Sequence, residues 1–119
     1  RGLSSAESFD VLTGQWEPLP SMPEGRFWST AAPLRGYLYI CGGSVNQRLI
    51  MNTAARFSPV DCAWQAVAPM WQCREGATAS ASGGRLYVCG GGDGREILQS
   101  CESYDPDMGE WRPEPYMLQ

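Results

Sequence analysis

A repeat of 48 residues constrains this chain more than any other feature of its sequence. Residues 37–43 read YLYICGG and residues 85–91 read RLYVCGG, so in both copies a short apolar run ends in two glycines. The same interval separates Arg26 from Arg74 and Tyr39 from Tyr87. A period of this length, built from short apolar runs, is typical of propeller blades and not of helical solenoids.

Aromatic residues mark the repeat a second time. Three tryptophans lie 48 and 47 positions apart, and seven positions before each there is a Phe or a Tyr. The pairs are Phe9 with Trp16, Phe57 with Trp64, and Tyr104 with Trp111. The last copy lacks one residue between the glycine pair and the aromatic, where residues 44–48 align with the shorter segment 92–95. Because length varies most easily in loops, the sequence predicts a loop there.

The pattern predicts an all-β fold of short antiparallel strands, because runs of five to seven residues alternate with turn residues. No stretch has a helical period. Pro33 removes a backbone donor within an expected strand, so we expect that strand to be short or bulged. The expected strands are 4–10, 15–20, 30–34, 37–41, 53–58, 63–68, 78–82, 85–89, 100–105 and 110–114.

The repeated residues have structural explanations. We expect the glycine pairs Gly42-Gly43 and Gly90-Gly91 to end buried strands where backbones approach closely, since Gly tolerates a positive φ. We expect each Trp to meet its aromatic partner across two adjacent strands and to fill the space between blades. The structural set is Gly42, Gly43, Gly90, Gly91, Trp16, Trp64, Trp111, Phe57 and Tyr104.

These landmarks together resemble the kelch repeat. The resemblance rests on the two glycine pairs, on the Phe/Tyr-to-Trp pairs, and on the run GRLYV from Gly84. It implies part of a β-propeller with four-stranded antiparallel blades. The implied units are the second half of a blade in residues 1–25 and complete repeats in 26–73 and 74–119.

Composition narrows the functional classes. The net charge of −4 disfavours a binder of duplex nucleic acid, which needs a basic face. No apolar run approaches the roughly 20 residues of a membrane helix. The chain has no His, so we expect neither a metal site nor a cofactor.

The five cysteines lack metal-binding spacing. We expect Cys41, Cys89 and Cys101 to be small buried side chains in a reducing compartment, and therefore a cytoplasmic protein, with nuclear or cytoskeletal placement as alternatives. A redox-sensing thiol at Cys62 or Cys73 is the competing interpretation.

Catalysis finds no support in the motifs. The chain has no nucleophile elbow, and its glycine-rich run 90–94 leads into a loop and not into a helix. Asp105, Asp107 and Glu110 fall in a turn and are interpreted as a solvated cluster. Copper oxidases built on kelch propellers use His and Tyr ligands, so the absence of His argues against that chemistry in this segment.

Recognition of a protein or peptide is therefore the predicted function. In kelch propellers, the loops from second to third strands and the connectors between blades form a binding face, which the resemblance places at 44–52, 92–99, 21–29 and 70–77. Packing between blades is the alternative role for Phe27 and Trp28, and we prefer it for Trp28. Where kelch proteins that capture acidic peptides have a second Arg after the repeat's Arg, this chain has Phe27 and Glu75. The candidate contact residues are Asn46, Gln47, Arg48, Asp93, Arg95, Glu96, Phe27, Trp28 and Glu75.

The apolar stretch 49–51 leaves two alternatives open, because Leu49, Ile50 and Met51 either fold back onto the blade or remain exposed.

The resemblance favours the substrate-recognition propeller of a BTB–kelch adaptor for a cullin-based ubiquitin ligase. The alternatives are an actin-binding scaffold and a non-catalytic segment of a propeller enzyme. Two and a half blades leave open sheet edges, which also predicts self-association.

Overall fold

The computed structural model describes residues 3–46 and 49–115, and within these ranges the regular structure is entirely β. Every strand is five residues long and coincides with or lies within a predicted range. The strands are β1 Ala6–Asp10, β2 Gln15–Leu19, β3 Thr30–Leu34, β4 Tyr37–Cys41, β5 Ala54–Ser58, β6 Ala63–Val67, β7 Thr78–Ser82, β8 Arg85–Cys89, β9 Cys101–Asp105 and β10 Glu110–Glu114. No helix in the described ranges could cross a membrane.

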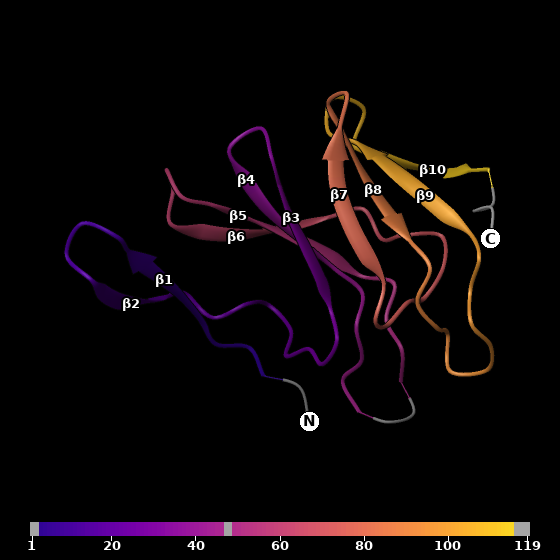
Figure 1. The fold of residues 1–119 in the computed structure, drawn as a ribbon, viewed down its shortest axis with the longest axis horizontal. Helices are drawn as coiled ribbons and strands as arrows, with labels where there is room; N and C mark the ends of the chain where they lie inside the picture. The colour runs from indigo at the N-terminus through magenta and orange to yellow at the C-terminus, as the bar shows by residue number, and fades with distance from the viewer. Residues whose placement is uncertain (1–2, 47–48, 116–119) are drawn as a thin grey trace.

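The strands form one hairpin and two blades. β1 pairs with β2, while β3-β4-β5-β6 and β7-β8-β9-β10 are four-stranded antiparallel sheets in which each strand neighbours the next. Figure 1 shows the two blades side by side, with inner strands β3 and β7 adjacent and the outer strands spreading away from them. The predicted four-stranded blades are confirmed.

Pro33 does not distort its strand, contrary to expectation. β3 pairs with β4 over all five residues from Thr30↔Cys41 to Leu34↔Tyr37, without a bulge. The reason is its place in the sheet: β3 is an edge strand that pairs only with β4. An edge strand can tolerate a residue without a backbone donor.

The aromatic pairs meet across strands as predicted. The register places Phe9, Phe57 and Tyr104 opposite Trp16, Trp64 and Trp111. The ring centroids lie 5.0, 5.2 and 5.1 Å apart, which is the range of favourable tilted contacts. Each pair therefore joins the third and outer strands of its blade.

The tryptophan N–H groups also join neighbouring blades. Trp64 Nε1 donates to the carbonyl of Pro20 at 2.7 Å, and Trp111 Nε1 donates to that of Ala68 at 2.7 Å. Pro20 and Ala68 each lie four positions after the Trp of the preceding blade. The repeat therefore includes one hydrogen bond from each outer strand to the connector before it.

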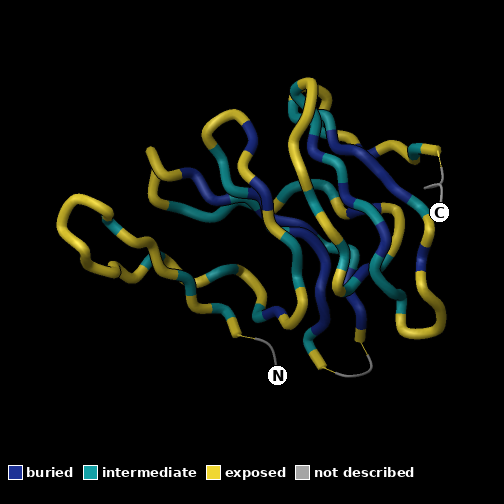
Figure 2. Tube along the Cα trace, viewed as in Figure 1, coloured by how far each residue is buried: buried dark blue, intermediate teal, exposed yellow. Residues whose placement is uncertain are grey.

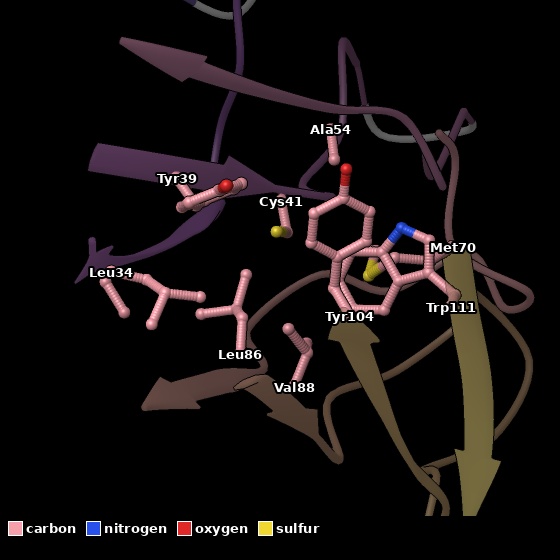
Figure 3. Close-up of a cluster of buried hydrophobic side chains, with 10 residues drawn as sticks. Leu34, Tyr39, Cys41, Ala54, Met70, Leu86, Val88, Tyr104 and Trp111 are labelled. Carbon is pink, nitrogen blue, oxygen red and sulfur yellow. The ribbon is translucent and has the colours of Figure 1, made fainter. Parts of the chain in front are cut away.

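The core lies between the two blades. Tyr39 and Cys41 from β4 pack with Leu86 and Val88 from β8, and all four are at most 1% exposed. Figure 3 shows these side chains converging with Tyr104, Met70 and Trp111. The hairpin β1–β2 lacks such cover, and Figure 2 shows it mostly exposed. Burial thus comes from blade against blade, which is the reason that single blades are not stable units.

Candidate partner-binding surface

Loops and connectors gather at one end of the blades. Phe27 exchanges two backbone hydrogen bonds of 2.8 Å with Ser44, and Glu75 exchanges two of 2.9 Å with Gly92. Each connector is thereby attached to the long loop of its own blade, along the lower edge of Figure 1. We call this edge the loop face; it comprises the connector residues Phe27, Trp28, Glu75 and Gly76 and the described parts of loops 43–53 and 91–99.

Two buried arginines position these connectors. Arg26 Nη1 donates to the carbonyls of Gly42 at 2.6 Å and Thr53 at 3.0 Å. Arg74, one repeat later, donates in the same way to Gly90 at 2.9 Å and Ser100 at 2.8 Å. Each guanidinium therefore binds both ends of its loop, and burial lowers the pKa of Arg26, with Glu24 acting in the opposite direction.

The counter-ions of these arginines differ between the blades. Arg74 forms a 3.1 Å ion pair with Glu102, and both side chains are at most 2% exposed. Arg26 pairs at 3.3 Å with Glu24, which is 44% exposed. Glu102 also accepts backbone hydrogen bonds from Trp71 at 2.7 Å and Gln72 at 3.2 Å. Sequence reasoning missed Glu102, although a Glu aligned with Ala55 of the preceding repeat was a detectable signal.

The glycine pairs allow the connectors to come this close, as predicted. A Cβ on Gly42, at φ 65°, would lie 2.3 Å from the carbonyl oxygen of Arg74, and one on Gly43 would lie 2.4 Å from that of Phe27. A Cβ on Gly91 would meet the carbonyl oxygen of Glu75 at 2.6 Å. These positions therefore accept only Gly, for reasons of both conformation and space.

Trp28 is not packed between the blades, which corrects the role preferred for it above. Its residue surface is 72% exposed and its φ is 52°. The neighbouring Phe27 is 37% exposed. The carbonyl of Trp28 accepts the N–H of Gly76 at 2.9 Å, so the connector of one blade touches that of the next. The backbone of Trp28 therefore joins the two connectors, while its indole lies outside the core.

The loop 92–97 is ordered by one carboxylate. Asp93 Oδ1 accepts the N–H groups of Arg95 at 2.9 Å and Glu96 at 3.0 Å, and these bonds hold the pKa of Asp93 below its usual value. The side chains of Arg95 and Glu96 are exposed. Glu75 lies beside this loop through its pairing with Gly92. Four of the predicted contact residues therefore lie together.

The equivalent loop of the blade β3–β6, which we call the middle blade because it lies between the hairpin and the last blade in the chain, is only partly described. Asn46 is exposed and its Oδ1 accepts the N–H of Leu49 at 3.0 Å, while predicted residues Gln47 and Arg48 lie outside the described residues. Leu49 is 55% exposed, whereas Ile50 and Met51 are 8% and 7% exposed. The stretch therefore folds back except at Leu49.

The described residues bring together no group of His, Cys, Asp and Glu side chains that could hold a metal ion. In the predicted turn cluster, Asp105 pairs with Arg85 at 3.3 Å and Asp107 pairs with Arg35 at 2.6 Å. Asp105 ends β9 and Asp107 lies in the β9–β10 turn, and Figure 1 shows this turn at the end of the blades opposite the loop face. The arrangement on the loop face can offer an aromatic surface and hydrogen-bonding side chains to a ligand.

Comparisons with known proteins agree with this architecture. The model of the Kelch motif matches residues 1–23, 29–70 and 73–118. A search of curated proteins found no match. The solved structure described as "Structure of YjhT" is similar to this chain with a TM-score of 0.84 and 18% identity, covering 96% of this chain and 46% of that one. At that identity the likeness shows the fold alone, and this chain spans less than half of the matched chain.

Proposed function

Because the chain belongs to the kelch-repeat family, we propose that its loop face binds a partner protein, with Trp28 as the principal anchor. A propeller blade turns its long loops and connectors to one end, so side chains there are free to vary without disturbing the sheets. Binding and catalytic residues concentrate on such loops, which a rigid scaffold positions.

The conformation and exposure of Trp28 carry this proposal. A bulky residue at positive φ is an outlier that costs about 1–2 kcal/mol relative to Gly. Gly76, with φ 69°, occupies the equivalent position in the next repeat. The fold therefore requires a left-handed residue at this position, yet the chain places a 72%-exposed indole there. Since folding gains little from that ring, a contact outside the described residues is the better explanation.

The neighbours of Trp28 suit protein recognition. Phe27 adds a second partly exposed ring, and the Gly76 hydrogen bond brings Glu75 and the Asp93 loop alongside. Arg95 offers a guanidinium that can bind a carboxylate through two oxygens. Trp and Arg are enriched among the residues that dominate binding energy at interfaces.

Panning a random peptide library on this chain tests the proposal. The decisive variant is Trp28→Gly, which removes the ring and installs the residue type of Gly76, so the fold should be preserved. The matched control is Val60→Ser, which removes a 95%-exposed apolar side chain from the β5–β6 turn at the opposite end. Wild type and Val60→Ser should select the same peptides, and Trp28→Gly should lose their binding by about tenfold or more.

Equal binding by the Trp28→Gly chain would refute the anchor. Arg95→Glu is a second variant on the same face, because the Arg95 side chain is exposed. If Trp28→Gly and Arg95→Glu both retain peptide binding, the loop face is not the binding surface.

The finer form of the proposal is substrate recognition for a cullin-based ubiquitin ligase. It is motivated by the resemblance of the repeats to BTB–kelch proteins and requires a BTB domain beyond these 119 residues. Sequencing the transcript on both sides of the segment tests it, since an encoded BTB domain is required. We also propose that the segment is non-enzymatic and works in the cytoplasm, which its lack of His and its unpaired cysteines support.

A further inference from the structure

Two cysteines face each other across the last blade. Cys89 is the final residue of β8 and Cys101 is the first residue of β9, and their Cα atoms are register partners. Paired residues of adjacent antiparallel strands project their side chains from the same face of the sheet. The two thiols therefore lie on one face at the point where the strands separate into the loop 90–100.

This position has the geometry that a disulfide needs. Gly90 N–H donates to the carbonyl of Ser100 at 3.0 Å, which makes the adjacent Cys89–Cys101 position a non-hydrogen-bonded pair. In such pairs the Cα atoms are about 4.5 Å apart and the side chains are closest. That separation lies at the short end of the roughly 4.4–6.8 Å found in disulfides.

We propose that Cys89 and Cys101 are a dithiol that oxidises to a disulfide across β8 and β9, closing the base of the loop 90–100. This assigns the oxidisable thiols to strand positions rather than to Cys62 or Cys73, which the sequence suggested. The proposal concerns covalent chemistry and stands independently of partner binding.

The middle blade provides an internal comparison. Cys41 occupies the position of Cys89, but its register partner is Ala54, which occupies the position of Cys101. Both blades therefore accommodate a Cys at the end of the second strand, and only the last has a Cys opposite it. Substituting Cys101→Ala reproduces a pair that this fold already contains, so it should leave the sheet intact.

The exposure of the two side chains sets the order of reaction. Cys89 is half-buried and Cys101 is 8% exposed, so an oxidant meets Cys89 first. With glutathione disulfide as oxidant, the Cys89 thiolate attacks one sulfur, forming a mixed disulfide and releasing one glutathione thiolate. Cys101 loses its proton to solvent, attacks the Cys89 sulfur and releases the second glutathione. Two protein thiols are oxidised, one glutathione disulfide is reduced to two glutathiones, and no other reactant is needed.

The rate should depend steeply on pH. Burial raises the pKa of the Cys89 thiol to about 11, and a hydrogen bond with Cys101 contributes to the rise. Because the thiolate is the attacking species, the first step should accelerate about tenfold per pH unit between pH 7 and 9. The pair is therefore suited to slow oxidation and not to rapid sensing.

The test uses the complete chain with Cys62→Ser, which removes the exposed thiol and its intermolecular disulfides. After incubation with glutathione disulfide at pH 8–9, tryptic digestion cuts at Arg95, between the two cysteines. We expect linked peptides 86–95 and 96–119, each containing one cysteine, and a chain lighter by two hydrogens. In Cys62→Ser/Cys101→Ala the reaction should stop at a glutathione adduct on Cys89.

Unlinked peptides, whether reduced or with glutathione on Cys89, would overturn the proposal if circular dichroism shows the sheet intact. An adduct on Cys101 in a Cys62→Ser/Cys89→Ala chain, formed as fast as that on Cys89, would overturn the order of exchange. A linked product should resist denaturant better than its reduced form, because the bond shortens the free loop of the unfolded chain.

Discussion

Replacing Glu102 with alanine should lower the free energy of unfolding by about 3–5 kcal/mol, the cost of leaving one member of a buried ion pair unpaired. Arg74 is 1% exposed in its side chain and cannot turn to water. The substitution removes the carboxylate at 3.1 Å and leaves the N–H groups of Trp71 and Gln72 without their acceptor. Because Ala55 occupies this position in the middle blade, alanine itself fits the strand.

The matched control is Glu24→Ala, which removes the counter-ion of the equivalent Arg26. The Arg26 side chain is 2% exposed, but Glu24 is 44% exposed at 3.3 Å, so water can replace its carboxylate and the loss should cost less, about 1 kcal/mol. A second variant, Glu102→Ala/Gln72→Glu, moves the carboxylate to the position that corresponds to Glu24. It should recover part of the loss, because the middle blade uses this arrangement.

Equilibrium unfolding in guanidinium chloride, followed by tryptophan fluorescence, measures these differences when the slope with denaturant is unchanged. Salt provides a further check, because the partly exposed Arg26–Glu24 pair should weaken with ionic strength more than the buried Arg74–Glu102 pair. If Glu102→Ala and Glu24→Ala differ by less than about 1 kcal/mol, the buried pair does not have the predicted importance.

Three further predictions concern other contacts in the same fold. Gly42→Ala should cost about 4 kcal/mol or more, because its Cβ would lie 2.3 Å from a backbone oxygen, whereas Gly14→Ala, with nothing within 4 Å, should cost about 1–2 kcal/mol. Denaturant unfolding of both variants decides this. Trp111→Ala should cost about 3–5 kcal/mol and Trp16→Ala about 1 kcal/mol or less, since the residues are 6% and 64% exposed; similar losses would contradict the blade-packing argument. Backbone hydrogen bonds hold the pKa of Asp93 below its usual value. The carboxylate therefore stabilises its loop fully when the pH is above that usual pKa, and this stabilisation is lost as the pH falls through the lowered pKa. Amide resonances of residues 95 and 96 should shift together on acidification, and Asp93→Asn should remove that titration.

The strands and the aromatic contacts within each blade were predictable because they follow from residue spacing. The period of 48 located the strands to within a few residues, since each blade places its apolar runs and turns at fixed intervals. Seven residues from Phe57 to Trp64 is the distance along a hairpin that brings two side chains opposite each other, so their contact followed directly. The glycine pairs were identified for the same reason, because only their residue type satisfies the strand ends.

Burial of equivalent residues was decided by the neighbouring blade and not by the repeat. Ile50 and Ile97 hold the same place in their loops, pairing with Ser44 and Gly92, yet they are 8% and 87% exposed. Ile50 lies beneath the next loop, where a Cβ on Gly94 would be 3.4 Å from its Cγ1. The sequence pattern predicts the same burial for both isoleucines, whereas the packing of one blade on another buries Ile50 and leaves Ile97 exposed.

Residue spacing and the kelch resemblance were enough to predict the repeat, the strands, the aromatic pairs and the end of the blades to which the candidate loops belong. Three facts required the folded structure: Trp28 is exposed, Arg74 and Glu102 form a buried pair, and Cys89 and Cys101 lie opposite each other. These facts depend on contacts formed across a long loop or between blades. Residue spacing predicts partners across a tight hairpin, such as Phe57 and Trp64, but it does not report solvent access or the partners that meet across a longer loop or between blades.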